Sequence, residues 1–333
     1  MAERVVVIGD GAMGTTCAVI LAKKGYGVTL WSYSDEQVKQ IRQHRENRLF
    51  LPGVKLPVSI ELTGDDAVVF REVGLAISAV PCVFLRSVWG RLSKHLGADL
   101  PIISVTKGIE NNTLLRPTQI LHDVTGPRRL AVLSGPNIAC ELARSLPATS
   151  TVAANDPALA EKVQKTFSTN WLRVYTNTDV VGVELAGATK NVIAIAAGII
   201  DGLGVGDNAK AALVTRGLVE ITRLGLALGA REQTFAGLSG MGDLITTCIS
   251  PTGRNRTFGE AIGRGQTIEV ALKGIPGEVE GVNTCNSVFK LAQEHHVEMP
   301  ITEAVFGILF EQKTVSEAIN ELMTRRLKAE SPS

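Results

Sequence analysis

The start of the chain contains a short apolar run, Arg4 to Ile8, followed at once by glycines at positions 9, 11 and 14. The run has the β-branched composition of a buried strand, and residues 13–24 have the apolar spacing of a helix. A strand joined to a helix through Gly-x-Gly-x-x-Gly is the tight turn of a βαβ unit. This feature predicts that the protein begins with such a unit and builds a parallel sheet.

Short β-branched runs and longer helical patterns keep alternating through the first half of the chain, as in βαβ units. Strands are expected at residues 4–8, 28–31, 75–80, 102–106, 130–134, 149–153 and 172–175. Helices are expected at residues 13–24, 35–45, 81–95, 114–124, 137–144 and 157–167.

From about Asp179 the runs become long, apolar and rich in Ala and Gly, with hardly any strand pattern. Helices are expected there at residues 211–228, 254–263, 268–272, 284–295, 301–310 and 315–323. We therefore predict an α/β domain in residues 1–180, an all-α domain in residues 181–328 and a frayed tail in residues 329–333.

The composition limits the classes of partner. With 333 residues, of which 45% are hydrophobic, the chain is long enough for two domains, because single cores stop growing near ~250–300 residues. The 34 Lys and Arg against 33 Asp and Glu give a net charge of +1, so no attraction to nucleic acid or to an anionic membrane is expected. The aromatic content of 5% argues against a base-stacking surface.

Neither a metal site nor a disulfide framework is indicated. The five cysteines are scattered without CxxC spacing, and the five histidines have no partners at HExxH-like spacing. The N-terminal residues lack the long apolar region of a signal peptide. The apolar run after Asn191 meets Asp201 after nine residues, short of the ~20 needed to span a bilayer. A cytoplasmic protein without a metal is expected.

The glycine loop reads GDGAMG over residues 9–14, and its place between strand and helix is the context that binds a dinucleotide. Gly9 permits the tight turn, Gly11 lets the backbone approach a pyrophosphate, and Gly14 lets the helix close on the sheet. A plain glycine turn is the alternative. Asp10 places a carboxylate in a loop suited to anions, so its side chain is expected to turn away or to have its charge offset.

The end of the second strand affects the choice of dinucleotide. An acid that binds the adenine ribose of NAD is expected roughly 20 residues beyond the glycine loop, but the chain reads Trp31-Ser32-Tyr33 there. The small polar groups and the cations that follow suit a 2′-phosphate, so the pattern favours NADPH at least as much as NADH. These cations are Lys39, Arg42, Arg45 and Arg48. The alternative is that they only form the solvated face of a surface helix.

A single lysine, Lys190, lies in the most apolar stretch of the chain, residues 181–200. Burying an ammonium group costs free energy unless the group is paired or used. Its neighbours at helical spacing include Ala186 and Gly187, which leave room for a ligand beside the amine. Lys190 is therefore the first candidate for a catalytic residue, and a lysine that reaches solvent or pairs with a buried acid is the alternative.

Three further segments carry candidate site residues. Lys107 follows a predicted strand, at the sheet edge where open α/β folds bind ligands. The segment SGPN, residues 134–137, ends another strand and offers backbone N–H groups and a capping residue. Asp243 is flanked by glycines, and Arg254 with Asn255 stands at a predicted helix start that suits a phosphate. The plainer alternatives are a surface lysine, a helix cap and an exposed arginine.

Together these segments resemble the bacterial-type NAD(P)-dependent glycerol-3-phosphate dehydrogenase family. The resemblance runs over nearly the whole chain, through GDGAMG, VTKGIE, LSGPNIACEL, VELAGATKNVIAIAAGIIDGLG, NAKAALVTRGL, GLSGMGDLITTC, GRNRTFG, VEGVNT and EMPIT. It implies a Rossmann-like N-terminal domain, an all-α C-terminal domain of the 6-phosphogluconate dehydrogenase C-terminal type, and a homodimer. It also implies the NAD(P)H-dependent interconversion of dihydroxyacetone phosphate and sn-glycerol 3-phosphate for phospholipid synthesis.

The resemblance implies roles for individual residues. Lys190 matches the general acid/base, and Lys107 and Asp243 match its companions around the reacting carbonyl. Substrate contacts are implied for Lys107, Gly135, Asn137, Lys190, Asn191, Asp243, Gly253, Arg254 and Asn255, with Arg254 and Asn255 as the phosphate clamp. Cofactor contacts are implied for Gly9, Gly11, Ala12, Met13, Gly14, Tyr33, Lys107, Ala139, Arg254, Glu278 and Glu280.

The chain departs from the family pattern in three places, which involve four positions. The family usually has alanine at Asp10, serine and then an aromatic residue at Ala12 and Met13, and serine at Gly253. The first two departures change the cofactor loop. The third removes a hydroxyl that could have held the phosphate.

The predicted mechanism passes a hydride from nicotinamide to a ketone carbon while Lys190 protonates the forming alkoxide. Burial and the charge of Lys107 are expected to lower the pKa of Lys190 toward neutrality, and Asp243 is expected to orient the amine and limit that shift. The nearest alternatives are β-hydroxyacid and 6-phosphogluconate dehydrogenases, although their catalytic lysine typically precedes an asparagine by four residues, and Asn191 is adjacent here. A non-catalytic NAD-binding regulator is the alternative from another class.

Overall fold

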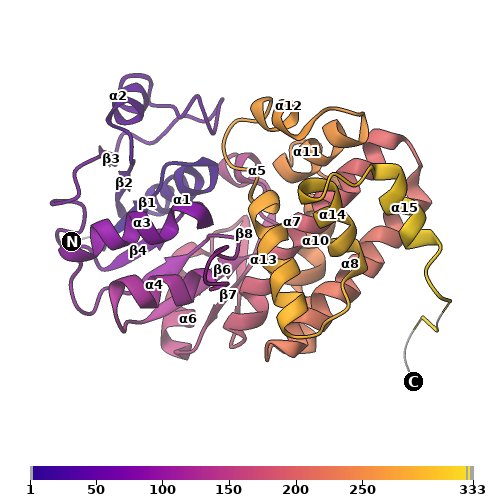
Figure 1. The fold of residues 1–333 in the computed structure, drawn as a ribbon. Coiled ribbons are helices and arrows are strands. Elements are labelled where there is room, and N and C mark those ends of the chain that lie inside the picture. The colour runs from indigo at the N-terminus through magenta and orange to yellow at the C-terminus, as the bar shows by residue number, and fades with distance from the viewer. Residues whose placement is uncertain (1–2, 328, 331–333) are drawn as a thin grey trace.

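The computed structural model describes residues 3–327 and 329–330, so residues 331–333 of the expected tail lie outside the described residues. The strands are β1 (Arg4–Ile8), β2 (Gly27–Trp31), β3 (Ile60–Thr63), β4 (Leu75–Ser78), β5 (Ile102–Ser104), β6 (Leu130–Ser134), β7 (Ala148–Ala154) and β8 (Leu172–Asn177). They form one sheet in the order β3-β2-β1-β4-β5-β6-β7-β8. Figure 1 shows this sheet in the N-terminal half and a mass of helices in the C-terminal half, which confirms the predicted fold class.

The sheet differs from the prediction at one pairing. Every neighbouring pair is parallel except β6 and β7, which are antiparallel. The connection between these two strands contains only the five-residue helix α5 (Ala139–Ala143). That helix is too short to carry the chain back along the sheet for a parallel crossover.

Helices cover both faces of the sheet. The helices of this half are α1 (Ala12–Lys23), α2 (Asp35–His44), α3 (Cys82–Leu92), α4 (Pro117–Thr125), α5 and α6 (Pro157–Phe167). Leu21 of α1, Leu142 of α5 and Leu159 of α6 belong to one apolar core, whereas Leu85 of α3 and Ile120 of α4 belong to another. The two cores lie on opposite faces, because strand side chains alternate between them.

Some predicted boundaries are wrong for local reasons. The strand β3 was not predicted because its four residues alternate buried and exposed at the edge of the sheet. The helix α4 begins at Pro117 and not at Leu114, whose φ of 57° is left-handed and breaks a helix. The helix α13 begins at Glu280, four residues before the predicted start, so Glu280 lies in its first turn.

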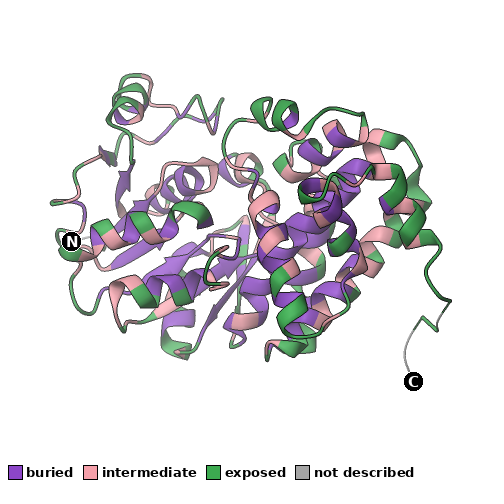
Figure 2. Cartoon of the chain, in the orientation of Figure 1, coloured by how far each residue is buried: buried purple, intermediate pink, exposed green. Residues whose placement is uncertain are grey.

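The C-terminal half consists of helices around a buried central one. They are α7 (Val180–Leu203), α8 (Asp207–Ala227), α9 (Glu232–Phe235), a π-helical turn (Leu238–Gly242), α10 (Asp243–Ile249), α11 (Arg254–Gly263), α12 (Ile268–Lys273), α13 (Glu280–Glu294), α14 (Pro300–Phe310) and α15 (Val315–Met323). Figure 2 shows buried residues along α7, the predicted apolar stretch. α7 has the length and hydropathy of a membrane-spanning helix, but 94% of its most apolar window is buried inside the protein, as in a core helix.

Glycines let α7 and α11 cross at very close range. A methyl group at Gly198 of α7 would lie 2.0 Å from the carbonyl oxygen of Arg256, and one at Gly259 of α11 would lie 2.0 Å from that of Ile195. Neither distance is possible for a carbon atom, so the two backbones touch only because side chains are absent. This crossing brings the first turn of α11, with Arg254, alongside the helix that carries Lys190.

A buried carboxylate joins the two halves of the molecule. Glu184 of α7 accepts hydrogen bonds of 2.7 Å from the backbone N–H and from the hydroxyl of Thr118 on α4, and it pairs with Arg116. Burial raises the pKa of Glu184, and the charge of Arg116 opposes that rise. The contact holds α7 against the sheet domain, where its next turns face the carboxyl ends of the strands.

Candidate active site

The glycine loop has the geometry of a nucleotide-binding turn. Gly9 has a φ of 104°, and a methyl group on it would lie 2.7 Å from the carbonyl oxygen of Ala79, just beyond β4. A methyl group on Gly14 would lie 1.9 Å from the carbonyl oxygen of Gly9, whereas one on Gly11 would meet nothing within 4 Å. The turn is therefore packed tightly on the protein side and open at Gly11, where a pyrophosphate needs access to the backbone. The residues present fit a dinucleotide.

Asp10 turns its side chain out of this loop. Its Oδ2 accepts a hydrogen bond of 2.9 Å from the hydroxyl of Ser32, the first residue after β2. The expectation that the carboxylate turns away is therefore met. A second anchor was not predicted: Asn47, fully buried, donates to the backbone oxygen of Asp10 at 2.6 Å and to the hydroxyl of Thr15 at 2.8 Å. No sequence spacing points to Asn47, because it lies in a loop 37 residues further on.

Two lysines from different halves of the chain share one carboxylate. Nζ of Lys107, after β5, lies 2.5 Å from Oδ2 of Asp243, and Nζ of Lys190, on α7, lies 2.6 Å from Oδ1. Asp243 is 1% exposed, at the start of α10. The structure thus brings together the three residues that the sequence placed around the reacting carbonyl. Two cations and one anion leave this cluster with a net positive charge.

The surroundings of Lys190 lower the pKa of its amine. Burial lowers the pKa of Lys190 to about 8, with a further lowering by the charge of Lys107, while Asp243 raises it and so limits the shift. A group with a pKa near ambient pH is a more effective acid/base than an ordinary lysine. Thr247 on α10 also accepts a hydrogen bond from Lys190 and donates one of 2.7 Å to the backbone oxygen of Asp243. Its spacing of four residues from Asp243 was the signal that could have identified it.

Arg254 and Asn255 lie at the start of α11 with groups free for a ligand. Arg254 is exposed and makes no hydrogen bond or ion pair to any of the described residues. Asn255 uses its side-chain oxygen to accept from the backbone N–H of Gly281 at 2.9 Å, which leaves its amide N–H groups available. Burial raises the pKa of Glu280, and the charges of Arg254, Lys107 and Lys190 oppose that rise. The first turn of α13 therefore faces the same cluster.

The segment after β6 is held differently from the prediction. Asn137 does not cap α5, whose N-cap is Ile138. Its side chain donates to the backbone oxygen of Thr149 and accepts from the hydroxyl of Ser150, each at 3.0 Å, so it fixes the segment to β7. Gly135, with a φ of 149°, accepts from Nζ of Lys107 at 3.3 Å. The segment therefore holds Lys107 in place, and the side-chain amide of Asn137 is already engaged with β7.

A buried hydroxyl beside this segment was not predicted. Ser134 is 2% exposed, and its Oγ has no hydrogen-bond partner among the described residues. A methyl group on Gly187 of α7 would lie 3.0 Å from this oxygen and 3.5 Å from Cγ of Lys107. The absence of a side chain at Gly187 thus lets α7 approach the ends of β5 and β6. Asn191 is 3% exposed one residue beyond Lys190 and makes no side-chain hydrogen bond to the described residues.

The remaining predicted cofactor residues lie around the glycine loop and the facing helices. Ala12 begins α1, and its backbone oxygen accepts from Thr16 at 2.8 Å. Thr16 also donates to the backbone oxygen of Ala139 at 3.1 Å, which ties the start of α5 to α1. Met13 lines a small cavity together with Lys107 and Asn137. Tyr33 is 73% exposed, Glu278 is half-buried just before α13, and Gly253 is the N-cap of α11 without a side chain to cap it.

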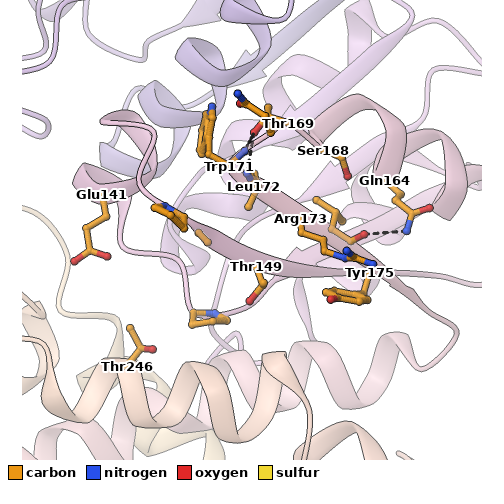
Figure 3. Close-up of a pocket in the computed structure, with 15 residues that line it drawn as sticks. Glu141, Thr149, Gln164, Ser168, Thr169, Trp171, Leu172, Arg173, Tyr175 and Thr246 are labelled. Atoms are coloured by element: carbon orange, nitrogen blue, oxygen red, sulfur yellow. Dashed lines mark hydrogen bonds between the residues drawn. The ribbon is translucent and has the colours of Figure 1, made fainter.

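A separate groove lies away from this cluster. It has a volume of about 840 Å³ and runs along β7 and β8, with Thr246 of α10 at one end. Figure 3 shows Trp171, Arg173 and Tyr175 on the wall formed by β8, and the guanidinium of Arg173 lies 5.1 Å from the ring centre of Tyr175. Neither Lys107 nor Lys190 lines this groove, so the reacting groups lie elsewhere.

Comparisons with known proteins agree with the geometry. Residues 4–160 match the family model of the NAD-dependent glycerol-3-phosphate dehydrogenase N-terminus, and residues 179–320 match that of its C-terminus. The glycerol-3-phosphate dehydrogenase (NAD(P)+) of Citrifermentans bemidjiense is 49% identical, over 99% of each chain, and that of Geobacter sulfurreducens is 47% identical over the same shares.

Solved structures give the same result. Glycerol-3-phosphate dehydrogenase from Coxiella burnetii has a TM-score of 0.94 at 36% identity and covers 97% of this chain and 99% of its own. D-mandelate dehydrogenase, with a TM-score of 0.63 at 15% identity over 93% of this chain and 98% of its own, shares the fold alone. The predicted family is therefore confirmed over the other dehydrogenase classes. The chain belongs to the NAD-dependent glycerol-3-phosphate dehydrogenase family.

Proposed function

We propose that the protein catalyses the NAD(P)H-dependent, reversible reduction of dihydroxyacetone phosphate to sn-glycerol 3-phosphate. The observation that carries the proposal is the carboxylate of Asp243 shared by Lys107 and Lys190 at the carboxyl edge of the sheet. Membership of the family supports the same reaction. The product would supply the backbone of glycerophospholipids.

Lys190 is the proton donor in this proposal. The reduced nicotinamide, when bound, supplies the hydride that the ketone carbon accepts. As negative charge develops on the carbonyl oxygen, Nζ of Lys190 donates a proton to it, and in the reverse direction the neutral amine takes the proton back. A pKa of about 8 leaves both forms populated near neutral pH. The ammonium group of Lys107 stabilises the forming alkoxide, and Asp243 orients both amines.

The phosphate group is assigned to the first turn of α11. A guanidinium offers two parallel N–H donors to a phosphate, and a helix N-terminus adds oriented backbone N–H groups. Arg254 makes no hydrogen bond or ion pair to the described residues, although its charge acts on Glu280, and the amide N–H groups of Asn255 are free. Gly253 contributes only backbone, so the clamp depends on these two side chains.

A substrate panel tests the proposal. Oxidation of NADH and NADPH is followed by absorbance with dihydroxyacetone phosphate, and the reverse reaction with glycerol 3-phosphate, 3-hydroxyisobutyrate and 6-phosphogluconate. We expect turnover with the triose phosphate and glycerol 3-phosphate alone. Oxidation of 3-hydroxyisobutyrate or 6-phosphogluconate without glycerol 3-phosphate would replace the proposal with one of the rival reactions. Cofactor binding without any turnover would favour a regulator.

The same proposal covers the division into domains, the location in the cell, the oligomeric state and the class of partner. We infer a division into domains at residues 180 and 181, where β8 has ended and α7 begins. We also infer a cytoplasmic homodimer that binds small molecules and neither nucleic acid nor membrane. Exposed apolar side chains on α8, such as Val219 and Leu226, are compatible with a partner subunit there. Light scattering at low protein concentration tests the dimer, and a monomeric mass would overturn it.

A further inference from the structure

The carboxylate of Asp10 is held at the carboxyl end of β2. Oγ of Ser32 donates to Oδ2 of Asp10 at 2.9 Å and accepts from the backbone N–H of Ser34 at 3.2 Å. Ser32 is 2% exposed, so this hydroxyl is a fixed anchor. The backbone of Asp10 is fixed as well, because its carbonyl oxygen accepts from the buried amide of Asn47 at 2.6 Å. The bond from Asn47 holds the backbone of Asp10, and the bond from Ser32 holds its carboxylate beside β2.

This is the position from which dinucleotide folds distinguish their cofactors. An acid at the end of the second strand binds the hydroxyl groups of the adenine ribose, and a cation near that place accommodates a 2′-phosphate. The chain has no acid at the strand end itself, where Ser32, Tyr33 and Ser34 follow β2. The glycine loop, which follows the neighbouring strand β1, supplies the acid Asp10 at this place, because β1 and β2 are paired in the sheet.

We propose that Asp10, anchored by Ser32, determines the cofactor preference, accepting a hydrogen bond from the 2′-hydroxyl of NADH and repelling the 2′-phosphate of NADPH. This inference rests on the proposed dehydrogenase function. It reverses the expectation from the sequence, in which the missing acid and the following cations favoured NADPH at least equally. Oδ1 of Asp10 accepts no hydrogen bond from any other described residue and is the acceptor left for the ribose.

The cations that followed β2 in the sequence do not offset this charge. Arg42 donates to the backbone oxygen of Leu62 at 2.8 Å, and Arg45 donates to that of Ile60 at 3.2 Å, so both guanidinium groups bind the β3 segment. Lys39 and Arg48 are exposed. None of these side chains forms an ion pair with Asp10.

Arg91 is another cation beside the end of β2. Its guanidinium lies 5.2 Å from the ring centre of Trp31 and 5.0 Å from that of Tyr33. It forms an ion pair of 2.8 Å with Asp66, which also accepts from the indole of Trp31. The charge of Arg91 is thus already balanced, and the stack offers a flat surface to the adenine and no free cation to a 2′-phosphate.

The electrostatics of Asp10 support a ligand role over a structural one. Burial raises the pKa of Asp10, the hydrogen bond from Ser32 lowers it, and no cation is among the causes. A partly buried carboxylate without a cation is unfavourable for folding alone. A hydroxyl donor from a bound ribose would relieve part of that cost.

Separate binding measurements for the two cofactors test the proposal. Calorimetric titration of the full-length protein without substrate gives Kd for NADH and for NADPH, and circular dichroism and thermal unfolding check the fold. We expect the wild type to bind NADH more tightly by roughly tenfold or more, because a facing like charge is strongly unfavourable. In Asp10→Asn, which keeps the shape and removes the charge, NADPH should bind more tightly and the ratio of the two Kd values should fall by roughly tenfold.

Matched variants make the test specific. Glu36→Gln removes an acid from the first turn of α2, where the side chain accepts a hydrogen bond from Gln40, and should leave the ratio of Kd values unchanged. Asp10→Ala is the second variant if Asp10→Asn does not fold, and it should lower the ratio in the same direction.

Three outcomes overturn the proposal. They are a wild-type preference for NADPH, equal wild-type affinities, and a ratio that stays the same in a folded Asp10 variant. The measurement needs no turnover, so a failure of the proposed reaction with normal NADH binding leaves it standing. Binding of neither cofactor would overturn both proposals.

Discussion

Nζ of Lys190 lies 2.6 Å from Oδ1 of Asp243, and the two side chains are 7% and 2% exposed. An ion pair this deeply buried costs desolvation free energy that the attraction alone offsets only in part. Here the pair lies beside a second cation, Lys107. The charge of Lys107 makes the cluster less stabilising for the fold, but it lowers the pKa of Lys190, which suits a group that donates and accepts a proton. The arrangement is better explained by chemistry than by folding.

Removing the amine of Lys190 should abolish most turnover and leave cofactor binding intact. For Lys190→Met we expect kcat to fall by roughly 10²- to 10⁴-fold, the usual contribution of a positioned acid/base. Lys313→Met is the matched control, because Lys313 pairs with Glu321 at 2.7 Å near the C-terminus, away from the cluster. Steady-state rates with dihydroxyacetone phosphate and the Kd for NADH are measured. Near-wild-type turnover in Lys190→Met would remove Lys190 from the mechanism.

The lowered pKa of Lys190 predicts opposite pH profiles in the two directions. Reduction needs the protonated amine, so its kcat/KM should fall as pH rises through about 8. Oxidation of glycerol 3-phosphate needs the neutral amine, so its kcat/KM should rise through the same value. Initial rates across neutral and alkaline pH give both curves. If the inflection persists in Lys190→Met, it belongs to another group.

Neutralising Asp243 should shift those profiles and weaken the fold. Asp243 raises the pKa of Lys190, so in Asp243→Asn the inflection should move to lower pH. The free energy of unfolding should fall by about 3–5 kcal/mol, because the buried ammonium group of Lys190 and the partly buried one of Lys107 lose their shared partner.

Asp201→Asn is the control for the Asp243 variant. Asp201 also pairs with two cations, Lys210 at 2.8 Å and Arg256 at 2.6 Å, but it lies outside the site. This variant should lose stability in denaturant unfolding without moving the inflection. An unmoved inflection in Asp243→Asn would show that Asp243 does not tune the proton donor.

Local sequence signals predicted the parts of the site that depend on local structure. The glycine loop, Lys107 after β5 and Arg254 at the start of α11 each follow from the element that carries them, because strand ends and helix starts have fixed chemistry. The antiparallel β7 could not be predicted, since strand direction depends on where the short connection through α5 packs.

The contacts of individual side chains were the other feature that the sequence could not predict. Whether Asn137 caps a helix or binds β7, and which residue binds the carboxylate of Asp10 once it has turned out of the loop, depends on contacts between segments distant in sequence. The spacing of residues along one segment contains no information about such contacts.

Arg254 should contribute to the binding of the substrate through its phosphate group, which is tested at saturating NADH. For Arg254→Ala we expect kcat/KM with dihydroxyacetone phosphate to fall by roughly 10- to 100-fold, because a hydrogen bond to a charged group contributes about 1.5–3 kcal/mol. With dihydroxyacetone, which has no phosphate, the slow rate should be the same in Arg254→Ala as in the wild type. Arg264→Ala, at the other end of α11 and paired with Glu260, is the control and should leave both rates unchanged. Equal losses with both substrates would assign Arg254 a different role.

Two glycines of the first turn should respond differently to the same added methyl group. In Gly14→Ala the new carbon would lie 1.9 Å from the carbonyl oxygen of Gly9, so the turn must move, and stability should fall by about 1–3 kcal/mol or more along with NADH affinity. In Gly11→Ala the carbon meets nothing within 4 Å, so the thermal unfolding temperature should match the wild type. NADH affinity should still be lost, because the methyl group occupies the space that a pyrophosphate needs. Wild-type NADH binding in Gly11→Ala would mean that the phosphates do not lie against this turn, and the open side of the loop would need another explanation.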